Sequence, residues 1–303
     1  MTNRVKRQRL RPDKDSNSSN SRDCKYNAGL MGRRHSRRKA QNEAPKHLFD
    51  CWGEVTGQIR RAQHVALFCD FDGTLTPIRR HPDMVGLVPR VREVLRALAK
   101  SGITLGVVTG REIADVRKRV GLRGIWYAGA HGLLLRDPEN RPHSLVKPEQ
   151  TARIRKAARL LARQIRGTRG LWIERKIATV ALHYRGAPPK SQVIARDAVA
   201  RAMERDPHLC LLASKKVWGL LPDAQSDKWR GISFVMEREQ QRISGGRWLL
   251  IFVGDDATDE RVFAKMRGIS IAVGKKSKTA ARYWLRSPGE VRKFLERLNA
   301  MRR

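Results

Sequence analysis

The sequence predicts an α/β protein in which helices cover a parallel sheet and a smaller α+β module is inserted. Two observations support this fold class. Apolar runs typical of strands alternate with helical patterns over most of the chain, which implies a parallel sheet with helices on both faces. Between residues 142 and 222 the order changes, because two strands run consecutively on each side of a helix.

The parallel sheet is expected to contain five buried strands. Each is a short apolar run, and helical patterns such as Val91, Val94, Leu95 and Leu98 separate them. The strand candidates are residues 65–69, 103–108, 125–128, 248–253 and 269–273.

The inserted module begins with a helix that carries Ile154, Ala158, Leu161 and Ile165 at helical spacing. Its other predicted elements are strands at 171–174 and 177–184, a helix near 191–204, and strands at 209–213 and 215–221. The predicted organisation is therefore a basic extension over residues 1–46, a core formed by 47–141 and 223–303, and an α+β module over 142–222.

The formal net charge of the chain is +35. Residues 1–46 hold 14 basic and 4 acidic residues with few apolar ones, so we expect a disordered extension, or upstream sequence if Met31 is the true start. The rest of the chain holds 50 basic and 25 acidic residues. We consider nucleic acid an unlikely partner, because the basic residues are dispersed over predicted helix faces and no common recognition motif is present. A basic surface also attracts anionic substrates.

The apolar runs and the cysteines argue against several other classes of protein. The longest runs, such as residues 249–253, are far shorter than the roughly 20 residues that span a bilayer, and no secretory signal follows the start. The four cysteines have neither metal-ligand nor redox spacing. We therefore expect a cytoplasmic protein without a membrane partner.

The first strand candidate ends in two carboxylates. In HVALFCDFDGTLTPI, residues 64–78, an apolar run is followed by Asp70 and Asp72, then by Gly73 and Thr74. Open α/β proteins bind ligands at the carboxyl ends of their strands. Because residues i and i+2 of an extended segment point the same way, we expect the two carboxylates to crowd together. Mg²⁺, which prefers oxygen ligands and retains waters and substrate phosphate, would relieve that crowding.

Two further strand ends carry polar groups. Asp255 and Asp256 end the strand in RWLLIFVGDDATDERVF, and Asp259 begins the next helix. Thr109 and Arg111, in ITLGVVTGRE, stand at a helix start that can hold a phosphate. Separate strand and helix caps are the alternative explanation. Polar groups suited to binding a metal ion or a phosphate follow three separate strands. This agreement favours a metal-dependent phosphoryl-transfer site over separate caps.

These motifs resemble a known family. DFDGT at 70–74, VVTGR at 107–111, Lys228 and GDDATDE at 254–260 resemble, in this order, the four signature motifs of the haloacid dehalogenase superfamily of phosphohydrolases. With GAHG at 129–132, ERK at 174–176 and HYR at 183–185, residues 64–298 resemble the trehalose-6-phosphate phosphatases. The resemblance implies a Rossmann-like core with a C2-type cap, and Mg²⁺-dependent hydrolysis of trehalose 6-phosphate as the last step of trehalose biosynthesis.

The resemblance also implies roles for single residues of the core. Asp70 would be the nucleophile that forms an aspartyl-phosphate, and Asp72 would be the general acid and then the base. Mg²⁺ would be held by Asp70, the backbone carbonyl of Asp72, and Asp255. Thr109 and Lys228 would bind the phosphoryl oxygens. The neighbours that complete this site are Gly110 and Arg111 at the phosphate and Asp256 and Asp259 as supports.

Sugar recognition is expected from the cap. Candidates for binding hydroxyl groups are Glu174, Lys176, His183 and Arg185, together with His131. Strand alternation alone would also place polar residues on a solvent-facing side, and a histidine near a hinge can simply satisfy backbone groups. Trp126 and Trp172 are interpreted as core residues.

Three positions depart from the family pattern. In KKVWGLLPDAQSDKWRG, Gly219 stands where the family commonly has Glu, Leu221 stands at an Arg position, and Trp229 stands where Gly follows the lysine. A missing carboxylate removes one hydroxyl-binding group, so a phosphatase of a different sugar phosphate is the nearest alternative. Phosphomannomutases are less similar, because their second motif resembles GGSD rather than TGRE. A nucleic-acid-binding protein with a relict core is the alternative from another class.

Overall fold

The computed structural model describes residues 44–79, 85–214, 216–223, 226–275 and 278–302. The predicted basic extension, residues 1–46, lies outside these ranges except for its last three residues. Lys46 already belongs to a strand, because it pairs in parallel with Tyr283. A two-residue strand has no apolar periodicity of its own, so the sequence pattern did not predict it.

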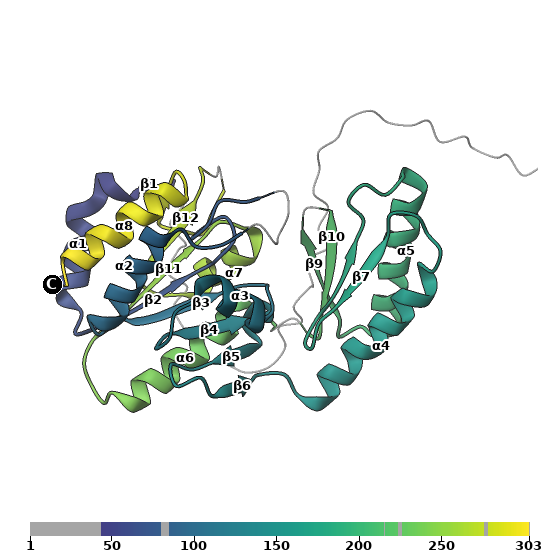
Figure 1. Cartoon of the computed structure of the whole chain (residues 1–303), viewed down its shortest axis with the longest axis horizontal. Coiled ribbons are helices and arrows are strands. Elements are labelled where there is room, and N and C mark those ends of the chain that lie inside the picture. The colour runs from purple at the N-terminus through teal and green to yellow at the C-terminus, as the bar shows by residue number, and fades with distance from the viewer. Residues whose placement is uncertain (1–43, 80–84, 215, 224–225, 276–277, 303) are drawn as a thin grey trace, which may run out of the picture. The chain divides into compact units, whose positions relative to one another are not determined.

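Strands and helices alternate along most of the chain (Figure 1). Their bounds are β1 (Lys46–His47), the 3₁₀ helix η1 (Leu48–Cys51), α1 (Trp52–Arg61), β2 (His64–Cys69), α2 (Pro89–Lys100), β3 (Thr104–Val108), α3 (Ile113–Val120), β4 (Trp126–Gly129), the 3₁₀ helix η3 (Ala130–Gly132), β5 (Leu134–Arg136), β6 (Pro142–Ser144), α4 (Pro148–Gln164), β7 (Trp172–Arg175), β8 (Val180–His183), α5 (Pro189–Arg205), β9 (Cys210–Ser214), β10 (Val217–Leu221), α6 (Lys228–Arg242), β11 (Trp248–Gly254), α7 (Ala257–Lys265), β12 (Ile269–Val273), β13 (Tyr283–Leu285) and α8 (Pro288–Ala300).

Among the described residues, the large sheet has nine strands in the order β1-β13-β12-β11-β2-β3-β4-β5-β6. Every neighbouring pair from β1 to β4 is parallel, whereas β5 and β6 continue the sheet in antiparallel pairs. All five predicted core strands are present in it. The α/β fold class and the mostly parallel sheet are therefore confirmed.

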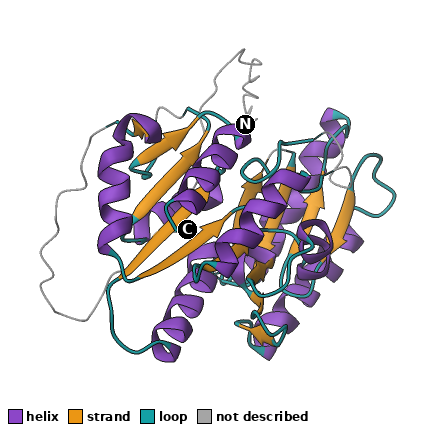
Figure 2. Ribbon diagram, turned by 60° about the vertical axis from the view of Figure 1, so that its left-hand side comes forward, coloured by secondary structure: helices purple, strands orange, loops and turns teal. Residues whose placement is uncertain are grey.

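Helices cover both faces of this sheet (Figure 2). Along β2 the side chains alternate, so that Leu67 and Cys69 pack with α1, α2, α3 and α8 on one face. Ala66 and Phe68 pack with α6 and α7 on the other face. A strand buried on both faces needs apolar residues at every position, and this explains the continuous apolar run before Asp70.

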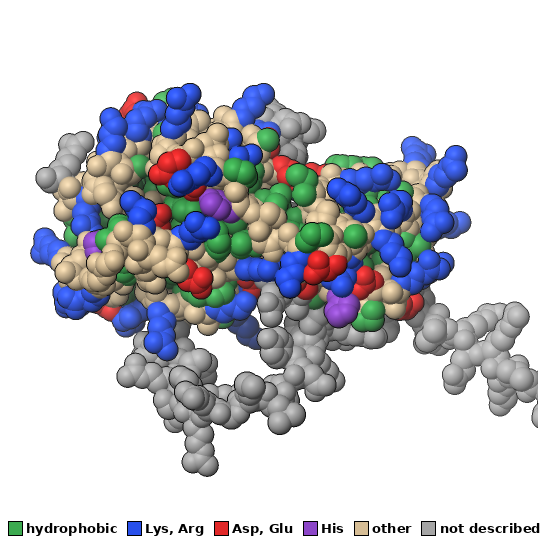
Figure 3. All heavy atoms as spheres, turned by 90° about the horizontal axis from the view of Figure 1, so that it is seen from below, with side chains coloured by type: hydrophobic (Ala, Val, Ile, Leu, Met, Phe, Trp, Pro, Cys, Tyr) green, Lys and Arg blue, Asp and Glu red, His purple; other side chains and the backbone are tan. Residues whose placement is uncertain are grey.

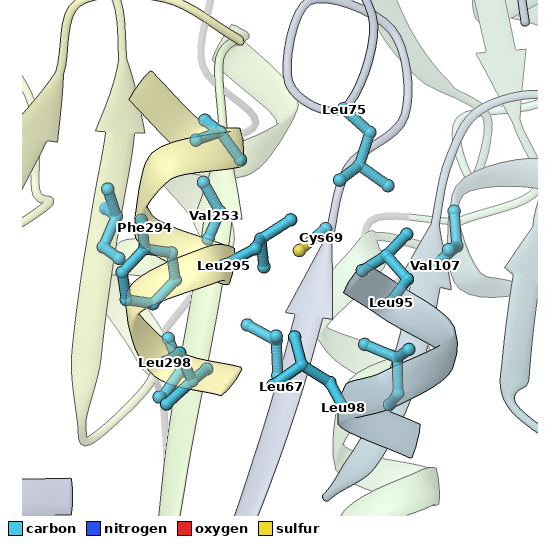
Figure 4. Close-up of a cluster of buried hydrophobic side chains, with 14 of the residues drawn as sticks. Leu67, Cys69, Leu75, Leu95, Leu98, Val107, Val253, Phe294, Leu295 and Leu298 are labelled. Carbon is cyan, nitrogen blue, oxygen red and sulfur yellow. The ribbon is translucent and has the colours of Figure 1, made fainter. Parts of the chain in front are cut away.

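The first of these cores lies between β2 and two helices. Figure 4 shows Leu67 and Cys69 of β2 between Leu95 of α2 and Leu295 of α8. These residues are completely buried. The core holds β2 firmly just before the strand ends at the two aspartates.

The register of the sheet places the ends of β2, β3 and β11 beside one another. Cys69, the last residue of β2, pairs with Val253 of β11 and with Val107 of β3. The residues that follow these strands therefore emerge side by side at one edge of the sheet, as the sequence predicted. This edge is where the candidate site forms.

A second, four-stranded sheet has the order β7-β8-β10-β9 and is antiparallel throughout. Helices α4 and α5 pack on it through a separate apolar core that includes Ile154, Leu161 and Ala195. This sheet and its helices lie within residues 142–222, where the sequence predicted an inserted module. We refer to them below as the cap.

Two predicted boundaries in this region are wrong. The segment 142–222 was assigned to the cap, yet β6 at its start pairs with β5 of the large sheet. The sequence of β6, PHS, has no apolar alternation that could have revealed it. A strand was also predicted from residue 177, but β8 begins at Val180, because Lys176 N–H donates to Thr179 O and closes a turn there.

The two tryptophans that were interpreted as core residues differ in the structure. Trp126 is buried, with its Nε1 donating to Glu239 Oε1 at 3.0 Å, so this prediction is confirmed. Trp172 is 55% exposed, and the prediction for it is wrong. Trp172 lies on the face of β7 opposite Ile173, the residue of that strand that packs into the cap core. Apolar character alone did not reveal which face of the strand is covered.

In the described part of the chain, no helix is both long enough and apolar enough to cross a membrane. Lys and Arg side chains are spread widely over the face shown in Figure 3, with fewer Asp and Glu among them. On this face, basic side chains of the described residues therefore lie at the surface.

We predict that Leu95→Ala lowers the free energy of unfolding by about 2–5 kcal/mol, because the truncation leaves a cavity between α2 and β2. Urea denaturation followed by circular dichroism measures the change. The control is Leu211→Ala, which removes a 37% exposed leucine and should cost far less. Equal losses in the two variants would contradict the packing described for this core.

Candidate active site

Lys228 joins the carboxylates of two neighbouring strand ends. Its Nζ donates to Asp70 Oδ1 at 2.7 Å and to Asp259 Oδ1 at 2.7 Å. Asp70 follows β2, whereas Asp259 lies in the first turn of α7, after β11. The Lys228 side chain is only 2% exposed. A buried ammonium between two buried carboxylates satisfies charges that could not otherwise be tolerated there.

The local structure around α6 explains how Lys228 reaches this place. Asp227 caps the helix, because its Oδ1 accepts from the N–H of Arg230 at 3.1 Å. Gly231 packs directly on Gly132, where a side chain would come within 2.7 Å of the Gly132 carbonyl oxygen. The helix can therefore approach η3 closely enough for Lys228, its first residue, to enter the sheet edge.

Asp255 stands beside the turn that follows β2. Thr74 Oγ1 donates to Asp255 Oδ1 at 3.2 Å. Gly73 has a φ of +83°, and any side chain there would collide with the Asp255 carboxylate. Glycine is therefore required by both conformation and space, and this accounts for Gly73 in DFDGT.

The loop from β11 to α7 is held by its own carboxylates. Asp259 Oδ2 accepts from the N–H groups of Asp255 at 2.9 Å and Asp256 at 3.0 Å. Asp256 Oδ1 in turn accepts from the N–H groups of Thr258 at 2.8 Å and Asp259 at 3.1 Å. This reciprocal capping fixes the start of α7 and the position of Asp255.

The electrostatics of the cluster show how much negative charge it concentrates. Burial raises the pKa of Asp70 well above its usual range, with Lys228 opposing the effect and the other aspartates adding to it. Burial and Asp256 likewise raise the pKa of Asp255. Although burial favours a neutral amine, Asp259 and Asp70 raise the pKa of Lys228, so it stays protonated.

Three carboxylates could hold a cation here. Oxygens of Asp70, Asp255 and Asp259 all lie within 4.8 Å of one another. Asp259 already uses both oxygens, one for Lys228 and one for backbone N–H groups, so it fits a supporting role better than a ligand role. Asp70 and Asp255 are crowded and costly to ionise together, and a hard divalent cation would relieve this cost.

The second aspartate of DFDGT has a different partner. Asp72 receives two hydrogen bonds from Arg111, from Nε at 2.6 Å and from Nη2 at 2.7 Å. The expected crowding of Asp70 by Asp72 is therefore wrong, because the charges that raise the pKa of Asp70 are those of Asp259, Asp256 and Asp255, whereas Asp72 pairs with Arg111. Asp72 is also absent from the group of three carboxylates, so any part of it in metal binding would come from its backbone.

Thr109, Gly110 and His131 lie together at the end of β3. The N–H of His131 donates to Thr109 O at 3.0 Å, and the imidazole lies over Gly110, where a side chain would collide with the ring. His131 itself has a φ of +59°, which is uncommon for a residue other than glycine. Burial, with help from Lys228 and Lys176, lowers the pKa of His131 to about 3, so the ring stays neutral.

The sugar-binding candidates of the cap form a chain of polar contacts. His183 Nε2 lies 3.0 Å from Glu174 Oε2, and Lys176 Nζ lies 3.4 Å from Glu174 Oε1. Lys176 Nζ also donates to Gly110 O of the core at 3.4 Å. Arg185 is exposed just after β8. The four residues, which the sequence singled out by their polarity and by the ERK and HYR motifs, thus come from two adjacent strands and the segments that follow them.

Several residues of the site were missed at the level of sequence. Asp115 accepts from Arg111 Nη1 at 2.7 Å and from Arg119 Nε at 2.7 Å, so it orients the arginine that holds Asp72. The spacing of four residues between 111, 115 and 119 was a signal for this row of ion pairs, which runs from the segment just before α3 along that helix. Glu112 was also missed, and no local pattern predicts its buried Oε1.

The family model described as Trehalose-phosphatase matches residues 68–288. The chain belongs to the trehalose-phosphatase family. It is 37% identical over 246 residues to trehalose-phosphate phosphatase of Mycobacterium tuberculosis, covering 78% of this chain and 62% of the relative. It is 31% identical over 259 residues to probable trehalose-phosphate phosphatase D of Arabidopsis thaliana, covering 81% and 70%. The chain thus spans about three fifths of the length of the mycobacterial trehalose-phosphatases.

Solved structures show the same fold. The C-terminal domain of trehalose-6-phosphate phosphatase from C. albicans aligns with a TM-score of 0.70 at 20% identity, covering 86% of this chain and 99% of that one. Trehalose-6-phosphate phosphatase of Aspergillus fumigatus aligns with a TM-score of 0.63 at 23% identity, covering 86% and 100%. The predicted membership in the trehalose-phosphatase family is confirmed.

We predict that His131 makes this protein less stable in acid. Its pKa is lowered to about 3 in the folded state, so the unfolded chain binds more protons between pH 6.5 and 3. Stability is full above pH 6.5 and falls as the pH drops through this window. Between pH 7 and 5, wild type should lose about 2 kcal/mol more than His131→Asn in urea denaturation. Parallel losses would show that the ring titrates normally.

Proposed function

We propose that this chain is a Mg²⁺-dependent phosphatase that hydrolyses trehalose 6-phosphate to trehalose and phosphate. The observation that carries the proposal is the buried Asp70 carboxylate, held by Lys228 beside Asp255 at the edge of a parallel sheet. Membership in the trehalose-phosphatase family supports the substrate class, which is a sugar phosphate.

The nucleophile in this proposal is Asp70. Its Oδ1 is bound by Lys228, which leaves Oδ2 to attack phosphorus and form an aspartyl-phosphate. Asp70, Asp255 and the backbone carbonyl of Asp72 would hold Mg²⁺, which supplies positive charge where a carboxylate meets a phosphate. Thr109 and Lys228 would bind phosphoryl oxygens, and Gly110 and Arg111 border the same place. Asp256 and Asp259 keep the metal ligand and the lysine in position.

Asp72 would act as general acid and then as base. Both oxygens of its carboxylate are hydrogen-bonded to Arg111, so this pair would have to open for Asp72 to reach the leaving group. A substrate phosphate is a strong competitor for a guanidinium, so substrate binding provides the exchange of partners. Asp72 would then protonate the departing sugar oxygen and afterwards take a proton from the water that hydrolyses the aspartyl-phosphate.

Recognition of the sugar would come from Glu174, Lys176, His183 and Arg185 of the cap, together with His131, which lies over Gly110 of the core. One observation favours a different sugar phosphate as second candidate. Gly219 of β10 pairs with Ala181, which in turn pairs with Glu174, so the row across the cap sheet carries a single carboxylate. The family commonly has a second carboxylate at Gly219.

Phosphate release from a panel of sugar phosphates tests this proposal. We expect trehalose 6-phosphate to have the highest kcat/KM, EDTA to abolish turnover, and Mg²⁺ to restore it. Asp70→Asn should reduce the rate by roughly 10⁴-fold or more, because an amide cannot attack phosphorus. Asp206→Asn, in the cap, serves as the matched control and should stay close to wild type. Substantial release by Asp70→Asn would overturn the mechanism, whereas preference for another sugar phosphate would overturn only the substrate.

The role of Asp72 predicts a dependence on the leaving group. Asp72→Asn should lower kcat for a sugar phosphate by about 10²- to 10⁴-fold, because the sugar oxygen leaves poorly without a proton. With an activated aryl phosphate the loss should be much smaller. Single-turnover phosphate release with both substrates measures the ratio. Equal losses would assign Asp72 to positioning alone.

A further inference from the structure

Trp172 is a large aromatic residue that the cap leaves open to solvent. Its side chain is 55% exposed, although its neighbour Ile173 on β7 packs into the cap core. An exposed tryptophan with polar groups around it is typical of ligand-binding surfaces, because it combines apolar area with few rotatable bonds.

The Trp172 ring is held in a fixed orientation. It is stacked on His183 with ring centroids 3.6 Å apart and an interplanar angle of 5°. His183 is itself held by Glu174, 3.0 Å from its Nε2, and Glu174 contacts Lys176. A chain of contacts thus runs from Lys176 through Glu174 and His183 to Trp172, and it holds one face of the indole against His183. The indole forms an aromatic surface beside ionised groups, which we call the Trp172 wall.

Strand geometry places this wall on the same side as the sugar-binding candidates. Residues i and i+2 of a strand share a face, so Trp172 and Glu174 point the same way from β7. Trp172 lies about 7 Å from Glu174 along the strand, on the side away from Lys176. Lys176 contacts Gly110 beside the phosphate position, so Trp172 is the more distant end of the row.

We propose that Trp172 is a specificity-determining residue that packs against the sugar ring remote from the phosphate. This inference rests on the proposed function, because it requires a substrate with two sugar rings. A pyranose has a face of C–H groups, and the negative face of an indole attracts such groups. Glu174 and His183 at the edge of the wall can bind the hydroxyl groups that surround that face.

The Gly219 departure makes this apolar contact more important in this chain. The row that starts at Glu174 continues through Ala181 and Gly219 without another polar side chain. Where this row offers no further hydroxyl-binding group, apolar surface is the remaining source of affinity. The Trp172 wall lies at the end of the cap sheet where that surface is available.

The experiment compares Trp172→Ala and Trp172→Phe with wild type on three substrates. For trehalose 6-phosphate, Trp172→Ala should lower kcat/KM by roughly 3- to 30-fold, mostly through KM, while Trp172→Phe should retain most of it. The loss should be clearly smaller for glucose 6-phosphate and for an aryl phosphate, which have no second sugar ring. Thermal melting checks that the exposed substitution leaves the cap folded.

Tryptophan emission on addition of trehalose gives a readout without turnover. Trp172→Phe should abolish the change in emission that wild type shows. The matched control is Trp218→Phe, because Trp218 packs into the core on the opposite face of the same sheet and its loss should leave the change intact. Equal losses on all three substrates, or an unchanged emission response in Trp172→Phe, would overturn the inference.

The two proposals fail in different ways. If wild type hydrolyses trehalose 6-phosphate and Trp172→Ala leaves its KM unchanged, the role of Trp172 is wrong while the proposed function stands. If wild type releases phosphate from the aryl substrate but not from trehalose 6-phosphate, the proposed function is wrong. The emission response to trehalose then decides about Trp172 by itself.

Discussion

The ion pairs of Lys228 are the constraint on which the site depends. Asp70, Asp255 and Asp259 gather at one sheet edge, and burial makes their negative charge expensive. The Lys228 ammonium, with 2.7 Å contacts to two of them, makes the arrangement tolerable in the folded state. Other features serve this contact, including the cap of α6 and the close approach of that helix to η3.

Two cations separate the two aspartates of DFDGT and give them different chemistry. Lys228 holds the carboxylate of Asp70 in a buried place and fixes its orientation. Arg111 holds Asp72 from a partly exposed position, in a pair that a substrate phosphate can displace. A pair of residues that look equivalent in the sequence thus become a nucleophile and an acid–base group in the proposed mechanism.

Much of the fold was predictable because its signals are local. A strand buried on both faces shows a continuous apolar run, and an amphipathic helix shows spacing such as that of Val91, Val94, Leu95 and Leu98. The features that were missed have no such signal. Strand β6 is three residues long and polar, and Trp172 is an apolar residue on the face of β7 opposite the cap core, where it stays 55% exposed.

The sequence by itself determined which chemistry gathers at the sheet edge, because strands that end in Asp70, Thr109 and Asp255 place them there in any parallel sheet of this order. Only the tertiary structure decided how these groups pair. Lys228 reaches Asp70 across 158 residues of chain, and the Asp72 side chain pairs with Arg111 rather than joining the group of Asp70, Asp255 and Asp259. The face of β7 that stays open was likewise decided by the packing of α4 and α5. Periodicity states which residues share a face, but only packing settles what covers it.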